Sequence, residues 1–112
     1  MATIGEVTKQ KDGSYVGKLK TLSIKADIAI VPVGKKTAAN GPDFMVSSKG
    51  VEVGAAWIRK GQRSGKDYVS VSFSAPEFGG KPLYANLGRK AGSTDPNEFV
   101  LIWNAQAVDV AE

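Results

Sequence analysis

Turn-forming residues divide this sequence into short apolar segments. Thirteen glycines and five prolines are spread over its 112 residues. Within the segments, apolar and polar side chains tend to alternate with a period of two residues, and no segment shows a convincing period of 3.6. Short alternating segments separated by turn residues are typical of antiparallel β-strands. The sequence therefore predicts an all-β protein.

About eight segments have the length and pattern of strands. The first two flank Asp12-Gly13, a dipeptide that tolerates the positive φ angles of tight hairpin turns. Pro32 ends the third segment, because proline cannot donate a ladder hydrogen bond. Gly34 to Pro42 is predicted to be a flexible connection or a wide turn. The predicted strands are Ile4 to Thr8, Tyr15 to Leu22, Ile24 to Val31, Phe44 to Ser48, Val51 to Lys60, Asp67 to Ser74, Pro82 to Leu87 and Glu98 to Trp103.

A chain of this length can bury one modest hydrophobic core. We expect a single β domain over residues 1–104 and a short C-terminal tail over residues 105–112. Closing the sheet would pair its edge strands, so the predicted architecture is a small antiparallel barrel or a strongly curved sheet. A two-layer sandwich is the alternative.

The sequence contains neither histidine nor cysteine. This excludes imidazole-based triads, thiolate nucleophiles and cysteine-containing zinc sites. The eleven carboxylates are scattered, whereas acid–base catalysis by a carboxylate pair needs two that converge on one substrate. We therefore expect a protein that is not an enzyme and that needs no cofactor or metal. Hydrolysis by an atypical carboxylate or lysine site is the less favoured alternative.

The balance of charge mildly favours acidic partners. The net charge is +4 and the isoelectric point is near 9.4, although the same balance can simply maintain solubility. The first ten residues lack the features of a signal peptide. The longest apolar stretch, Ile28 to Val33, is far shorter than the roughly 20 residues of a membrane span. We expect a cytoplasmic protein with no membrane partner.

The connection between the fifth and sixth predicted strands carries a cluster of basic residues. A projecting basic loop is accessible to a phosphate backbone, and this charge predicts single-stranded nucleic acid as a partner. Lys18 and Lys20 flank Leu19 on an outer strand face and extend the basic surface only if that face adjoins the loop. The candidate nucleic-acid-binding residues of the loop are Arg59, Lys60, Arg63 and Lys66.

Aromatic residues border this loop on both sides. Tyr68 shares one face of its predicted strand with three serines up to Ser74, and that face is either a polar exterior or a binding surface. Tyr68 is therefore the more accessible ring for stacking on a base. If the residues from Val51 alternate regularly, Trp57 shares their inward face, and the sequence favours a core position for it.

Three further aromatic residues have structural explanations. Tyr84 and Trp103 lie in apolar strand contexts and are predicted to be core residues. Phe78 lies in the turn-rich segment Pro76 to Pro82, where it either plugs a barrel end or anchors a protein contact. Phe78 and open strand edges favour the alternative function, a protein-interaction or self-associating module, and a homo-oligomer is one form of it.

The ordered motifs resemble a bacterial family known as domain of unknown function 736. The resemblance implies a small cytoplasmic protein often encoded near conjugation or other mobile-element genes, with no established activity or catalytic residues. It covers about residues 2 to 103 and rests on Ala2-Thr3-Ile4-Gly5, Val31-Pro32-Val33, Pro42-Asp43-Phe44, Gly54-Ala55-Ala56-Trp57, Tyr68-Val69-Ser70-Val71, Pro82-Leu83-Tyr84-Ala85 and Leu101-Ile102-Trp103.

Overall fold

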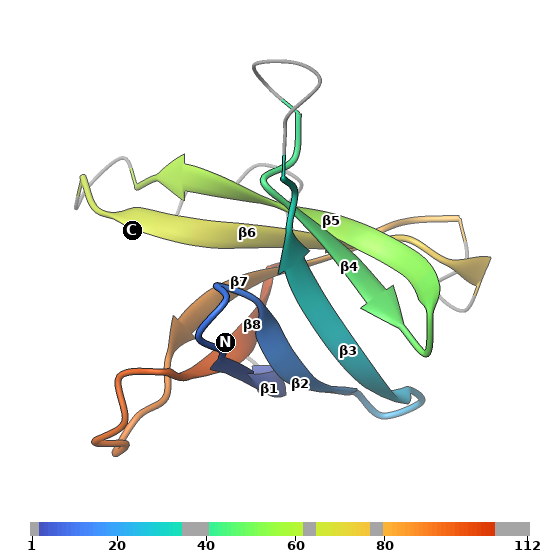
Figure 1. The fold of residues 1–112 in the computed structure, drawn as a ribbon. Coiled ribbons are helices and arrows are strands. Elements are labelled where there is room, and N and C mark those ends of the chain that lie inside the picture. Colours follow the sequence, from blue (N-terminus) through green and yellow to red (C-terminus); the bar gives the residue numbers. More distant parts are fainter. Residues whose placement is uncertain (1–2, 35–40, 62–64, 77–79, 105–112) are drawn as a thin grey trace.

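Eight antiparallel strands form a closed barrel in the computed structural model (Figure 1). The structure describes residues 3–34, 41–61, 65–76 and 80–104. The prediction of an all-β fold is correct, and the sheet closes. The predicted tail and most of the predicted wide turn lie outside the described residues. The strands are β1 (Thr3–Lys9), β2 (Tyr15–Lys20), β3 (Lys25–Pro32), β4 (Phe44–Ser48), β5 (Val51–Lys60), β6 (Asp67–Phe73), β7 (Leu83–Arg89) and β8 (Glu98–Asn104).

Each strand pairs with its neighbours in the sequence, and β1 pairs with β8 to complete the ring. The connections therefore alternate between two ends of the barrel. We call the end with the β1–β2, β3–β4, β5–β6 and β7–β8 connections the mouth end, and the other the far end. Because every described strand has a partner on both sides, the open strand edges expected for protein interaction are absent from this part of the chain.

The β1–β2 turn forms as Asp12 and Gly13 predict. Gly13 has a φ angle of 90°, a left-handed conformation that glycine adopts without steric cost. The Asp12 carboxylate accepts hydrogen bonds from the Ser14 hydroxyl and backbone N–H, at 2.6 and 2.9 Å. These two bonds lower the pKa of Asp12. Local side-chain chemistry therefore determines this turn.

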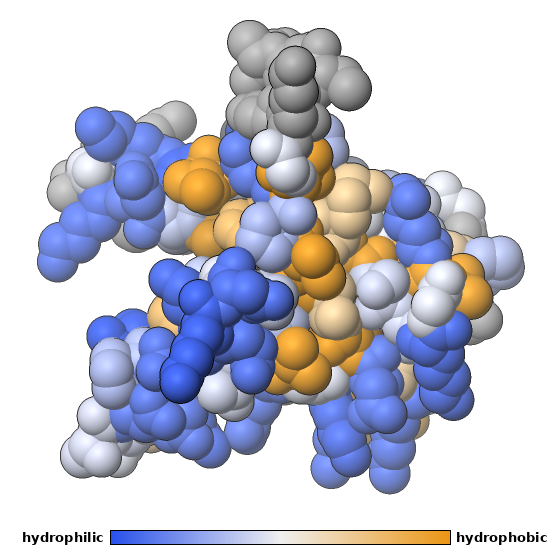
Figure 2. Space-filling view, viewed as in Figure 1, coloured by the Kyte–Doolittle hydropathy of each residue, from blue (hydrophilic) through white to orange (hydrophobic). Residues whose placement is uncertain are grey.

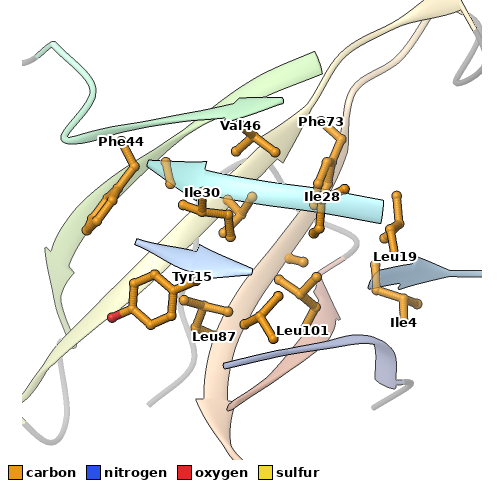
Figure 3. Close-up of a cluster of buried hydrophobic side chains, with 14 residues drawn as sticks. Ile4, Tyr15, Leu19, Ile28, Ile30, Phe44, Val46, Phe73, Leu87 and Leu101 are labelled. Carbon is orange, nitrogen blue, oxygen red and sulfur yellow. The ribbon is translucent and has the colours of Figure 1, made fainter. Parts of the chain in front are cut away.

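The core fills the inside of the barrel with alternate side chains from all eight strands. Figure 3 shows Tyr15 and Phe44 at one end of this cluster, and Ile4 and Leu19 at the other. The Tyr15 ring meets the ring of Phe44 edge-on, with 5.9 Å between centroids. The buried apolar residues are Ile4, Val7, Tyr15, Leu19, Ile28, Ile30, Phe44, Val46, Ala56, Val71, Phe73, Ala85, Leu87 and Leu101.

The prediction that Trp57 belongs to the core is wrong, because a β-bulge interrupts the alternation of β5. Val46 pairs with Gly54 and Ser47 pairs with Glu52, so Val53 is an extra residue on β5. A bulge reverses the side-chain alternation that follows it. Gly54 and the fully buried Ala56 therefore face inward, and Trp57 faces outward and is half-buried.

Tyr84 and Trp103 are also not core residues. Tyr84 pairs with Ser72 on the outer face of the barrel and is half-buried. Trp103 is 44% exposed, although it pairs with the buried Ala85. It lies one residue beyond Ile102, the last residue of β8 with a partner on the described part of β1. No described β1 residue is therefore in register to cover the Trp103 ring.

The barrel brings the backbone of β5 very close to that of β6 at Gly54, where a Cβ atom would overlap the carbonyl oxygen of Ser72. We expect Gly54→Ala to lower the free energy of unfolding by about 1–3 kcal/mol, because the two strands would have to separate. Gly34→Ala is the control, since nothing lies within 4 Å of a Cβ atom there. Urea titration of both variants tests this, and equal stability would contradict it.

Candidate nucleic-acid interface

The β5–β6 hairpin carries the predicted basic cluster and lies at the mouth end, on the left of Figure 1. The Gly61 N–H donates a hydrogen bond to the Lys66 carbonyl at 2.9 Å, which extends the pairing of the two hairpin arms beyond the β5–β6 ladder. Arg59, Lys60 and Lys66 are exposed. Arg63 lies outside the described residues. Three of the four predicted basic residues are therefore placed together on one accessible hairpin.

An aromatic surface adjoins these charges. The Arg59 guanidinium lies over the Trp57 ring, 5.7 Å from the ring centroid, within the range of a cation–π interaction. Arg59 is opposite Tyr68 in the ladder, and Trp57 is opposite Ser70. Residues directly opposite in an antiparallel pair project from the same face. Trp57, Arg59 and Tyr68 therefore form one outward surface.

This outer face continues across β6 and β7. Val71 and Phe73 are fully buried, which confirms that the alternating residues from Tyr68 to Ser72 face outward. Ser70 is opposite Asn86 in the next ladder. The outer face thus combines aromatic rings with small polar side chains, whereas the inner face is apolar.

Trp57 is the residue of this surface that alternation along the sequence misplaced. Gly54 was the available signal, because a glycine inside a strand pattern often marks a bulge or a close approach of two backbones. Here it marks both. Had the sequence prediction included a bulge before Gly54, it would have placed the Trp57 ring on the outer face.

Lys18 and Lys20 do not extend the basic hairpin. They lie on the outside of β2, which is separated from β5 in the ring by β3 and β4. Lys20 is at the far end of its strand and pairs with Lys25, and Lys18 pairs with Asp27. Together with Lys49 they line a separate hollow of about 370 Å³. The outer face of β2 does not adjoin the hairpin, so Lys18 and Lys20 do not form a continuous basic surface with it.

Other chemistry is sparse in the described part of the chain. It contains no group of three or more aspartates and glutamates that could hold a metal ion, and no helix long and apolar enough to cross a membrane. Lys90 Nζ lies 3.1 Å from Glu6 Oε1 on the outside of the barrel. This bond raises the pKa of Lys90, and exposed pairs of this kind contribute little to stability. Phe78, the predicted protein-contact residue, lies outside the described residues.

The fold and this surface define a class: a closed eight-stranded antiparallel barrel with a basic hairpin beside an aromatic outer face. The chain belongs to the DUF736 family, described as "Protein of unknown function (DUF736)", whose model matches residues 3–106. The match confirms the resemblance seen in the sequence. A comparison with curated proteins found no match, and neither did a comparison with solved structures.

Proposed function

We propose that this protein is a non-enzymatic module that binds single-stranded nucleic acid through the β5–β6 hairpin and the outer face beside it. The observation that carries the proposal is the position of the Arg59 guanidinium over the Trp57 ring, next to Tyr68 on the same surface. Cations beside accessible aromatic rings are the combination that holds single strands. A cytoplasmic role as an accessory protein of a mobile element is the setting that the family resemblance suggests.

The two kinds of side chain contribute differently to this binding. Lys60 and Lys66 attract phosphates without regard to sequence. Trp57 and Tyr68 provide faces on which unpaired bases stack, and bases inside a duplex are not available for such stacking. Asp67 lies opposite Lys60 and offsets one positive charge, so the three described cations leave a net positive hairpin.

A second candidate, a protein-interaction or self-associating module, is favoured by an apolar band on the outside of β2 and β3. Val16 and Val31 are 47% and 44% exposed, and Val31 is opposite Met45 in the β3–β4 ladder. Figure 2 shows hydrophobic residues gathered over this part of the surface between hydrophilic ones. Because the closed barrel has no open strand edges in its described part, this apolar band is the feature that favours a protein partner.

Fluorescence anisotropy with labelled single-stranded and duplex oligonucleotides tests the proposal. We expect single strands of DNA or RNA to bind more tightly than duplex at about 50 mM salt, and binding to weaken steeply toward about 200 mM. Each phosphate contact with a single strand contributes about 0.7 to the log–log salt slope, so three contacts predict a slope near −2. No binding at about 50 mM, with a mass that rises with concentration in light scattering, would overturn the proposal in favour of the second candidate.

A further inference from the structure

The mouth end of the barrel opens into a hollow of about 480 Å³. Tyr15, Phe44, Ile58 and Tyr68 contribute apolar and aromatic surface to its walls, and it is also lined by the charged residues Lys9, Asp43 and Asp67. Ile58 is 51% exposed, although it follows the inward-facing Ala56 by two residues. A large apolar side chain in such a position covers no core and faces the hollow. Pockets of this size in the mouths of β-barrels are common ligand sites.

Tyr15 supplies a polar group at this place. The residue is 6% exposed, and its ring is held edge-on by Phe44 and by Phe99, at 5.9 and 5.4 Å between centroids. Its hydroxyl makes no hydrogen bond with any described residue. Figure 3 shows that the hydroxyl points away from the core cluster. Burial raises the pKa of Tyr15, so near neutral pH the phenol is a protonated donor with no hydrogen-bond partner among the described residues.

The rim adds charged groups on both sides of the hollow. The Lys9 ammonium lies 6.0 Å from the centre of the Tyr15 ring, and Asp67 carries an exposed carboxylate. The Asp43 carboxylate, which accepts a hydrogen bond from the Ile58 N–H at 2.8 Å, also lines the hollow. The hollow therefore offers aromatic and aliphatic walls together with hydrogen-bond donors and acceptors. A planar heterocycle with donors and acceptors on its edge matches both properties, whereas a purely aliphatic ligand would leave the polar groups unpaired.

We infer that the barrel mouth holds one unstacked nucleobase, with the Tyr15 hydroxyl donating a hydrogen bond to an acceptor on the edge of the base. The inference rests on the proposed function, because it takes the base from the bound strand. Tyr68 connects the two regions, since it lies opposite Arg59 on the basic hairpin and also lines the hollow. A strand whose phosphates contact Lys60 and Lys66 thus passes beside the mouth. A free nucleotide offers the same base chemistry, and the experiment separates the two sources.

The test is Tyr15→Phe, which keeps the ring and its edge-on contacts and removes only the hydroxyl. We expect the affinity for a single-stranded oligonucleotide to fall about 3–10-fold, the usual effect of one hydrogen bond. The salt slope stays unchanged, because no phosphate contact is lost. Ser23→Ala is the control, because it also removes one hydroxyl but from an exposed residue of the β2–β3 connection at the far end of the barrel, away from the hollow and the hairpin. Its affinity is expected to equal that of the wild-type protein.

Backbone amide NMR shifts on addition of a nucleoside provide a second measurement, because a nucleoside lacks the phosphate that lysines attract. Shifts centred on Tyr15, Phe44 and Ile58, lost in Tyr15→Phe, would support the inference. If Tyr15→Phe binds the oligonucleotide as tightly as the wild-type protein does, the inference of a base in the barrel mouth is wrong. The proposed interface at the hairpin is not affected by that result. A mononucleotide that binds as tightly as the oligonucleotide would overturn the claim that the base in the mouth comes from a bound strand. Failure of the wild-type protein to bind any oligonucleotide would overturn the proposed function itself.

Discussion

Replacing Arg59, Lys60 and Lys66 together by glutamine is expected to weaken single-strand binding on the order of 10²–10³-fold at about 50 mM salt. All three side chains are exposed on the β5–β6 hairpin. Each phosphate contact with a single strand releases about 0.7 of a counterion, and three such contacts account for a loss of this size at low salt. Anisotropy titrations at several salt concentrations measure it, and the salt slope should become shallower by about 2.

The matched control replaces Lys20, Lys25 and Lys49 by glutamine. These lysines are also exposed, lie at the far end of the barrel and line a different hollow. Both triple variants remove three positive charges, so a partner attracted only by net charge would respond equally to both. Equal losses in the two variants would contradict an interface at the hairpin. Thermal unfolding of both variants checks that the barrel is intact.

Replacing Phe73 by alanine is expected to lower the free energy of unfolding by about 3–5 kcal/mol. The Phe73 side chain is fully buried among the inward-facing residues of the barrel. Its removal combines lost transfer free energy with a cavity that the ring of paired strands can close only in part. A domain of this size has a total stability of about 5–15 kcal/mol, so the variant should be much less stable or unfolded. Urea titration followed by circular dichroism measures the difference.

Ser72→Ala is the control on the same strand. Ser72 faces outward and is half-buried, and substitutions at such surface positions usually change stability by no more than about 0.5 kcal/mol. If Phe73→Ala and Ser72→Ala lost similar stability, the assignment of the inner and outer faces of β6 would be wrong. The comparison therefore tests the inward and outward alternation on which the candidate interface depends.

Local patterns in the sequence were sufficient for much of the fold. The Asp12-Gly13 turn forms because one carboxylate and one glycine determine it within four residues. The alternation from Tyr68 to Ser74 placed Val71 and Phe73 in the core because β6 contains no irregularity. The lack of histidine and cysteine by itself excluded imidazole and thiolate chemistry. Such features depend on residues a few positions apart, or on composition alone.

Features that depend on pairing between distant segments required the tertiary structure. The bulge at Val53 exists only in relation to Val46 and Ser47 on β4, and it turns Trp57 and Arg59 together to the outer face. The order of strands around the ring separates Lys18 and Lys20 from the hairpin. Closure of β1 onto β8 brings Phe99 against Tyr15 at the mouth. The sequence by itself determined the strands, their turns and a basic hairpin. The barrel's register decided which side chains surround that hairpin, because register is a property of paired strands and not of one segment.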